Sequence, residues 1–301
     1  MRAVQIRRWR LGAAFVLLTY VVLHFLNHAL GLVSLAAMEA GRWWFLALWR
    51  SALGTAALYG ALTVHGVLAL WLLYQRRSLR MPRWEATQYT LGLLVPALLA
   101  VHVTGTRIAW WRVGADDPYA RVVLNLWVLA PDYGWRQALI LTVVWLHACI
   151  GLHYWLRFRP WYPRAVPWLF AVALLLPVLA LLGFVAAGHE VAGLAQIPGW
   201  TARLLADTHA PAPAESALLA AIRRDFLNAY LAALSLVLLA RVVRQLRERR
   251  HSILVVYTSG RVVAAPRGYS ILEASRLGGV PHASVCGGRG RCSTCRVRVV
   301  R

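Results

Sequence analysis

Six long apolar runs constrain the fold of this chain more than any other feature of its sequence. Each run approaches the roughly 20 residues that a helix needs to cross the hydrocarbon core of a bilayer. Backbone groups inside lipid have no water to bond, so such runs fold as helices. The sequence therefore predicts a mainly α, polytopic membrane protein with a six-helix transmembrane bundle in residues 1–250. The six expected spans cover roughly residues 11–37, 51–74, 88–110, 137–156, 166–187 and 226–243.

The positive charge of the chain lies at the ends of these runs. All 33 basic residues are arginines, and they outweigh the 11 acidic residues by a net charge of +22. Because the arginines cluster beside apolar runs, they indicate membrane topology and argue against a nucleic-acid partner. The positive-inside rule puts both ends of the chain in the cytoplasm, with membrane lipid as a partner. The arginine-rich segments are residues 2–10, 76–83, 157–164 and 241–250.

Two long connections lie on the opposite side of the membrane in this topology. They cover about residues 111–136 and 188–225. Alanine and proline alternate at residues 210–214, which predicts irregular backbone in part of the second connection.

Five or six of the ten histidines fall inside the first four expected spans: His24, His28, His65, His102 and His147, with His153 near a span end. Ionisable side chains at membrane depth are costly and default to a functional hypothesis. At a helical rise of about 1.5 Å per residue, His65 and His147 lie roughly 13 Å from the cytoplasmic boundary, and His24 and His102 roughly 20 Å. These depths define two pairs, His65 with His147 and His102 with either His24 or His28. The last choice stays open, because a spacing of four residues puts His24 and His28 on one helix face.

Histidines at equal height on facing helices suit a b-type haem. Such a haem takes one imidazole on each face of its iron, and the other ring nitrogen of each imidazole needs a partner. The two pairs therefore predict two haem b groups. The alternative is that each histidine hydrogen-bonds between helices as an ordinary polar packing group.

The other reactive residues of the membrane part have plainer interpretations. Cys149 is expected to be a small buried side chain. His153 is expected near a membrane interface and His189 outside the bilayer. Arg107 either pairs with a haem propionate or extends to the interface. No catalytic residue is assigned, since the sequence has no nucleotide-binding glycine loop and no clear hydrolytic triad.

The composition changes after Arg250, which predicts a second domain in residues 251–301. Residues 251–257 and 261–265 are typical of two strands joined by a turn. A short helix is expected at 270–277, where Ser270 and Glu273 have the spacing of a capping box. Hairpin, helix and then a cysteine loop is the opening order of a β-grasp, ferredoxin-like α+β domain.

Three cysteines follow this helix with the spacing C-x5-C-x2-C. They are Cys286, Cys292 and Cys295, in a loop rich in glycine and arginine. This spacing fits three ligands of a plant- or vertebrate-type 2Fe–2S cluster, which takes four cysteine thiolates. No fourth cysteine follows in residues 296–301, so we expect the sequence to end inside the domain.

These motifs resemble two known families. The histidine pattern is similar to the dihaem cytochrome b anchor of the succinate dehydrogenase and fumarate reductase type, which pairs histidines from alternate helices. The loop Cys-Gly-Gly-Arg-Gly-Arg-Cys-Ser-Thr-Cys-Arg-Val-Arg-Val looks like the ferredoxin domain of bacterial membrane-anchored class III adenylate cyclases. In those proteins a hexahelical anchor and a 2Fe–2S domain precede the catalytic domain. The resemblance implies a bacterial inner-membrane location, a cyclase domain after residue 301 and a homodimer, because class III sites form between two catalytic domains.

Three functional hypotheses follow from the sequence. In the first, the chain is a redox-active anchor that senses the redox or quinone state and regulates a downstream adenylate or guanylate cyclase domain. In the second, it is a transmembrane oxidoreductase that passes electrons between quinol and a cytoplasmic acceptor. In the third, it is a non-redox membrane receptor whose histidines only pack. Because no catalytic domain lies in residues 1–301, the sequence alone leaves open whether the chain is an enzyme.

Overall fold

The computed structural model describes residues 3–79, 81–285, 287–288 and 293–299. Its chain divides into two compact units. The first unit combines Met1–Leu72 with Ser78–Leu234, and the second combines Leu73–Arg77 with Ser235–Arg301. We describe each unit separately.

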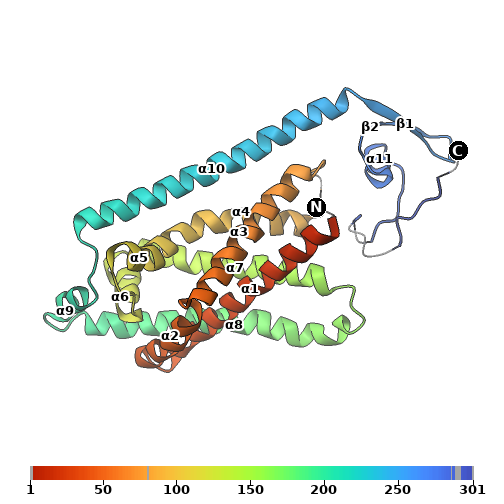
Figure 1. The fold of residues 1–301 in the computed structure, drawn as a ribbon. Coiled ribbons are helices and arrows are strands. Elements are labelled where there is room, and N and C mark those ends of the chain that lie inside the picture. The colour runs from red at the N-terminus through yellow and green to blue at the C-terminus, as the bar shows by residue number, and fades with distance from the viewer. Residues whose placement is uncertain (1–2, 80, 286, 289–292, 300–301) are drawn as a thin grey trace. The chain divides into compact units, whose positions relative to one another are not determined.

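The first unit is built from helices (Figure 1). Six helices of the described chain are long and apolar enough to cross a membrane, which confirms the expected architecture of a mainly α, multi-pass membrane protein. The long helices are α1 (Ala3–Ala29), α3 (Ala52–Gln75), α4 (Arg83–Val103), α7 (Pro131–Leu156), α8 (Tyr162–Leu194) and α10 (Pro213–Arg249). The shorter ones are η1 (Leu30–Leu32), α2 (Leu35–Trp49), η2 (Thr104–Ile108), α5 (Ala109–Val113), α6 (Tyr119–Leu124), η3 (Asn125–Leu129) and α9 (Trp200–Asp207).

The boundaries of the first and last spans differ from the sequence prediction. The first span ends at Leu32, five residues before the predicted end, and α2 starts immediately afterwards. Ser34 separates the two, because its extended backbone breaks the helix and its hydroxyl accepts a hydrogen bond from the Ala37 N–H at 3.0 Å. The last helix begins at Pro213 and not near residue 226, since proline suits a first helical turn and the following residues are good helix formers.

Close packing in the bundle relies on small residues. Helix α4 packs along α7, and α1 packs along α8. A Cβ atom added to Gly183 of α8 would collide with the backbone carbonyl of His28 in α1. A Cβ added to Gly31 would in turn collide with the backbone of Gly183. The two glycines thus let the helices approach at backbone distance, as small residues do between membrane helices.

The second unit contains the part of α10 that begins at Ser235, a hairpin and a short helix. Strands β1 (Ser252–Val256) and β2 (Val262–Pro266) pair antiparallel, with Leu254 opposite Ala264. Helix α11 (Ile271–Leu277) begins at Ser270, whose hydroxyl and the Glu273 carboxylate form the capping box that the sequence predicted. This order of elements confirms the expected start of a ferredoxin-like domain after the helical bundle.

The second unit also holds the segment that follows α3. Arg241 of α10 donates hydrogen bonds to the backbone carbonyls of Arg76 and Arg77, at 2.8 and 3.1 Å. Gln245 donates to the Arg77 carbonyl as well. The last carbonyls of a helix have no partner within the helix, and these side chains supply partners just after the end of α3. Positive side chains near this end are also favoured by the helix dipole.

Candidate functional site

A pocket in the first unit gathers three of the five membrane histidines. His24 and His28 reach it from α1 and His102 from the end of α4. The pocket holds about 860 Å³ of empty space, its open mouth included. Its lining also includes Tyr20, Arg107 and Gln137 beside apolar residues such as Phe45 and Phe184, so polar groups are frequent on its walls.

His24 is the centre of this histidine group. Its ring centre lies 5.9 Å from that of His102, and its Nε2 lies 3.3 Å from Nε2 of His28. The Nδ1 atoms of His24 and His28 are buried without a hydrogen-bond partner among the described residues. Buried polar atoms usually have partners, so these two nitrogens indicate a group that the protein atoms do not supply.

The second pair joins α3 to α7. The ring centres of His65 and His147 are 6.2 Å apart. The Nδ1–H of His147 donates to the backbone carbonyl of Gln88 at 2.9 Å, which leaves Nε2 with its lone pair for another ligand. His65 has a buried Nδ1 without a partner in the part of the chain that is described.

A glycine makes room for His147. Gly92 lies on α4, one turn after Gln88, and a Cβ atom there would come within 2.6 Å of the His147 ring carbon Cε1. Any side chain at position 92 would therefore push the imidazole away from its hydrogen bond with Gln88. The sequence analysis missed this glycine. Its only signal in the sequence is a spacing of four residues from Gln88, which puts both on one face of α4.

The ring separations test whether the two pairs fit an iron between them. Two imidazoles on opposite faces of one metal have ring centres roughly 6 Å apart, since each metal–nitrogen bond spans about 2.0–2.1 Å and each ring centre lies about 1 Å behind its nitrogen. The values of 5.9 and 6.2 Å are compatible with this spacing, which also falls within the range of roughly 4.5–7 Å for ordinary packed rings. Within the described chain no three His, Cys, Asp or Glu side chains gather into a metal cluster, but an axial haem pair needs only two.

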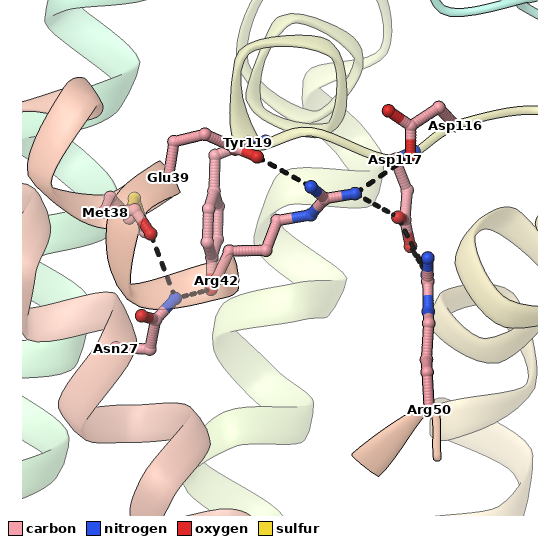
Figure 2. Close-up of polar contacts among 8 residues, drawn as sticks. All are labelled: Asn27, Met38, Glu39, Arg42, Arg50, Asp116, Asp117 and Tyr119. Atoms are coloured by element: carbon pink, nitrogen blue, oxygen red, sulfur yellow. Dashed lines mark hydrogen bonds and ion pairs between the residues drawn. The ribbon is translucent and has the colours of Figure 1, made fainter. Parts of the chain in front are cut away.

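A network of ion pairs centred on the buried Asp117 borders the first pocket (Figure 2). Asp117 accepts hydrogen bonds from Arg42 at 2.7 Å and from Arg50 at 2.6 and 2.8 Å. Arg42 also bonds Glu39 at 2.6 Å and Asp116 at 3.0 Å. Burial lowers the pKa of the Arg42 guanidinium, but the hydrogen bond to Asp117 and the three nearby carboxylates together raise it above its ordinary value.

A second part of this network ties α1 to α6. The Asn27 side-chain amide donates to the Tyr119 hydroxyl at 2.8 Å and to the Met38 carbonyl at 3.2 Å (Figure 2). The backbone N–H of Tyr119 donates to Glu39 at 2.8 Å. Burial raises the pKa of the Tyr119 hydroxyl, so it stays a neutral hydrogen-bonding group. The sequence analysis missed this network, because its members come from four separate segments.

Arg107 lines the same pocket as the histidines. Its guanidinium bonds the Thr55 hydroxyl at 3.2 Å and lies 4.9 Å from the ring centre of Trp110. Its Nη1 atom is buried and has no hydrogen-bond partner among the described residues. A buried guanidinium with an unpaired nitrogen can receive an anionic group.

The remaining residues that the sequence analysis weighed lie outside this pocket. His153 bonds the Tyr162 hydroxyl at 2.7 Å, and the His189 ring packs 5.5 Å from Trp127. Cys149 is a free, half-buried thiol beside an apolar cluster that includes Phe25 and Leu141. None of these three lines the pocket that holds His24, His28 and His102.

The cysteine loop is described only in part. Cys286 and Cys292 lie outside the described residues. Cys295 is half-buried and forms no disulfide within the described residues, and its backbone carbonyl lies 3.3 Å from Nε2 of His282. The backbone N–H of Val285 donates to the Thr294 hydroxyl at 3.1 Å, so the two ends of the loop contact each other.

Comparison with known proteins identifies this segment. Residues 255–301 match the family of 2Fe-2S iron-sulfur cluster binding domains. The C-terminal part of the chain is thus a 2Fe–2S binding domain attached to apolar helices, and a donor set of cysteine thiolates fits such a cluster. No curated protein and no solved structure matches the chain.

Proposed function

We propose that this chain is a redox-active membrane anchor. In this proposal the two histidine pairs hold haem b and the cysteine loop holds a 2Fe–2S cluster. The redox state of the chain then regulates a class III adenylate or guanylate cyclase domain downstream. The coarser function, electron handling by a ferredoxin-type domain on membrane helices, follows from the family match and the apolar helices.

One observation carries the haem part of the proposal. The ring centres of His24 and His102 are 5.9 Å apart, and those of His65 and His147 are 6.2 Å apart. Both values fit two imidazoles that share one metal ion, and the two pairs are those that the depths of the histidines along their helices predicted. Of the two candidates on α1, we take His24 as the partner of His102, because their ring centres lie 5.9 Å apart.

The neighbouring residues have clear roles in such a site. The Gln88 carbonyl fixes the His147 tautomer, so that Nε2 is the free donor atom. Arg107 offers its unpaired nitrogen to a propionate, in preference to extending to the membrane interface. Bound haem would supply one-electron chemistry at these positions, while the protein excludes water and holds the imidazoles.

The cysteine loop supplies the ligands of the iron–sulfur site in this proposal. Cys286, Cys292 and Cys295 would bind the cluster through their thiolates, and the family match supports that donor set. The arginines before α1 and at the end of α10 favour a cytoplasmic position for both ends of the chain. The bacterial inner membrane, a quinone as electron partner and a homodimer complete the proposal, the last by resemblance to class III cyclases.

An optical spectrum tests the haem sites directly. The purified full-length protein, reduced with dithionite, should show a b-type α band that corresponds to about two haems per chain. His65→Ala or His147→Ala should remove one haem and leave the other. His189→Ala is the matched control and should keep both. A reduced protein without an α band would contradict the proposal and leave the histidines as packing groups.

Gly92 provides a second arm of the same experiment. Gly92→Ala places a methyl group against the His147 ring, so we expect loss of about half the haem without any change in a ligand. Gly60→Ala is the control, because a Cβ atom at that exposed position meets nothing within 4 Å. Equal haem content in both variants would argue against His147 as a ligand.

A second function is favoured by the depths of the two pairs. The predicted depths of His24 with His102 and of His65 with His147 differ, so the pairs form successive positions across the membrane. Such an arrangement suits an oxidoreductase that passes electrons from quinol to a cytoplasmic acceptor. Steady turnover of a soluble acceptor with quinol would favour this function. Redox-dependent cyclase activity of the full-length protein without such turnover would favour the anchor.

A further inference from the structure

We propose that His282 is a positioning residue that holds Cys295 in place for the iron–sulfur cluster. The inference rests on the proposed role of Cys295 as a ligand and adds a residue that contacts no metal. The imidazole lies between two partners, with Nε2 at 3.3 Å from the Cys295 carbonyl and Nδ1 at 2.9 Å from the Ser275 hydroxyl. It therefore bridges the cysteine loop and α11.

The α11 side of this bridge is rigid. Ser275 has no exposed surface, and its hydroxyl contacts the Tyr257 hydroxyl at 2.8 Å and the Ile271 carbonyl at 2.8 Å. Tyr257 directly follows β1, so the hydroxyl of Ser275 is fixed from both the hairpin and the helix. The hydrogen bond to Ser275 therefore holds the His282 side chain in place as well.

The hydrogen-bond directions follow from the chemistry of the partners. A carbonyl oxygen only accepts, so Nε2 of His282 must carry the hydrogen that faces Cys295. In the neutral imidazole Nδ1 is then an acceptor, so the Ser275 hydroxyl shares its one hydrogen between Nδ1 and the Ile271 carbonyl and accepts from the Tyr257 hydroxyl. The result is one directed chain of hydrogen bonds that starts at Tyr257 and ends at the peptide of Cys295.

This chain matters because the orientation of a ligand depends on its supporting contacts. A donor on the Cys295 carbonyl fixes the peptide plane from which the thiolate projects. The positive end of the His282 N–H dipole also faces this peptide, which favours the reduced and more negative state of a nearby cluster. Hydrogen bonding around the ligands is one of the terms that set the potential of such clusters.

Two substitutions separate the halves of the bridge. The amide nitrogen of glutamine reaches about as far as Nε2, so His282→Gln keeps a donor for Cys295. The shorter asparagine reaches about as far as Nδ1, so His282→Asn keeps only the contact with Ser275. The full-length protein is compared with both variants by iron and sulfide content, by the electron paramagnetic resonance signal of the dithionite-reduced cluster and by redox titration.

We expect His282→Gln to retain the wild-type signal and midpoint potential. We expect His282→Asn either to lose cluster or to show an altered signal with a midpoint shifted to more negative values. An unchanged His282→Asn protein, or equal losses in both variants, would overturn the role of His282. A Cys295→Ser variant with an intact cluster, or a wild-type protein without a 2Fe–2S signal, would instead refute the cysteine assignment, and this inference would fall with it.

Discussion

Asp117 has a buried side chain, although its position in a polar connection between two helices predicts an exposed one. It lies in the short polar connection between α5 and α6, yet its side chain is only 8% exposed. Arg42 and Arg50 both bond its carboxylate; Arg42 lies in the middle of α2, and Arg50 directly follows its last residue. One buried acid therefore joins two cations beside the histidine pocket.

Removal of this carboxylate should destabilise the first unit. Asp117→Asn leaves two buried guanidinium groups with a neutral partner, and breaking a buried ion pair costs about 3–5 kcal/mol. Asp116→Asn is the matched control in the same loop, since that side chain is 52% exposed and exposed pairs contribute at most about 1 kcal/mol. Denaturant unfolding in detergent measures both, and similar midpoints for the two variants would show that the Asp117 pairs add little.

At the scale of elements, α3 is linked by its last residues to α10. The side chains of Arg241 and Gln245 bond the carbonyls of Arg76 and Arg77, which follow α3 directly. Arg77 also lies 3.4 Å from Glu248 at the end of α10 and 3.7 Å from Glu273 in the first turn of α11. All of these contacts lie within the second unit, where they join the residues after α3 to α10 and α11.

Loss of the linkage should expose the connection after α3 to protease. Arg241 is 7% exposed, and hydrogen bonds from a charged group contribute about 1.5–3 kcal/mol each. We expect Arg241→Gln to speed trypsin cleavage after Arg76 and Arg77 by about tenfold or more, because local opening becomes easier by that free energy. Arg247→Gln, at an exposed position of the same helix, should leave the cleavage rate unchanged. Equal cleavage rates in the two variants would contradict the linkage.

At the scale of the whole molecule, the arginine distribution makes a prediction about topology. A cysteine at the exposed position of Ala214 should react with a membrane-impermeant thiol reagent on intact cells. A cysteine at the exposed position of Ser259 should react only after the membrane is permeabilised. The parent protein supplies the background from its own cysteines. Labelling of position 259 on intact cells would contradict the predicted orientation and place this end of the chain outside the cytoplasm.

Much of the fold was predictable from local sequence alone. The apolar runs determined the six membrane helices, because a bilayer leaves a long apolar segment no other stable conformation. The capping box of Ser270 and Glu273 likewise determined the start of α11, since its two hydrogen bonds join residues three apart. The irregular stretch expected at residues 210–214 is confined to the residues before Pro213, because helix formation extends α10 further than apolarity does.

The candidate site was likewise predictable only in the features that depend on a single segment. Depth arithmetic along each helix predicted which histidines belong together, and the structure brings His24 near His102 and His65 near His147. It did not predict Gly92, the Asp117 network or the bridge through His282, because each depends on residues from different segments meeting in space.

The sequence by itself thus determined the membrane helices, the hairpin and helix that open the C-terminal domain, and the types of residue that can hold a cofactor. These features depend on interactions between near neighbours or between a segment and its solvent. Only the tertiary structure decided how near the rings of His24 and His102 lie, which carboxylate bonds both Arg42 and Arg50, and which side chain contacts the carbonyl of Cys295. The physical reason is that contacts between side chains of distant segments depend on how the helices pack. The spacing of residues within one segment does not predict that packing.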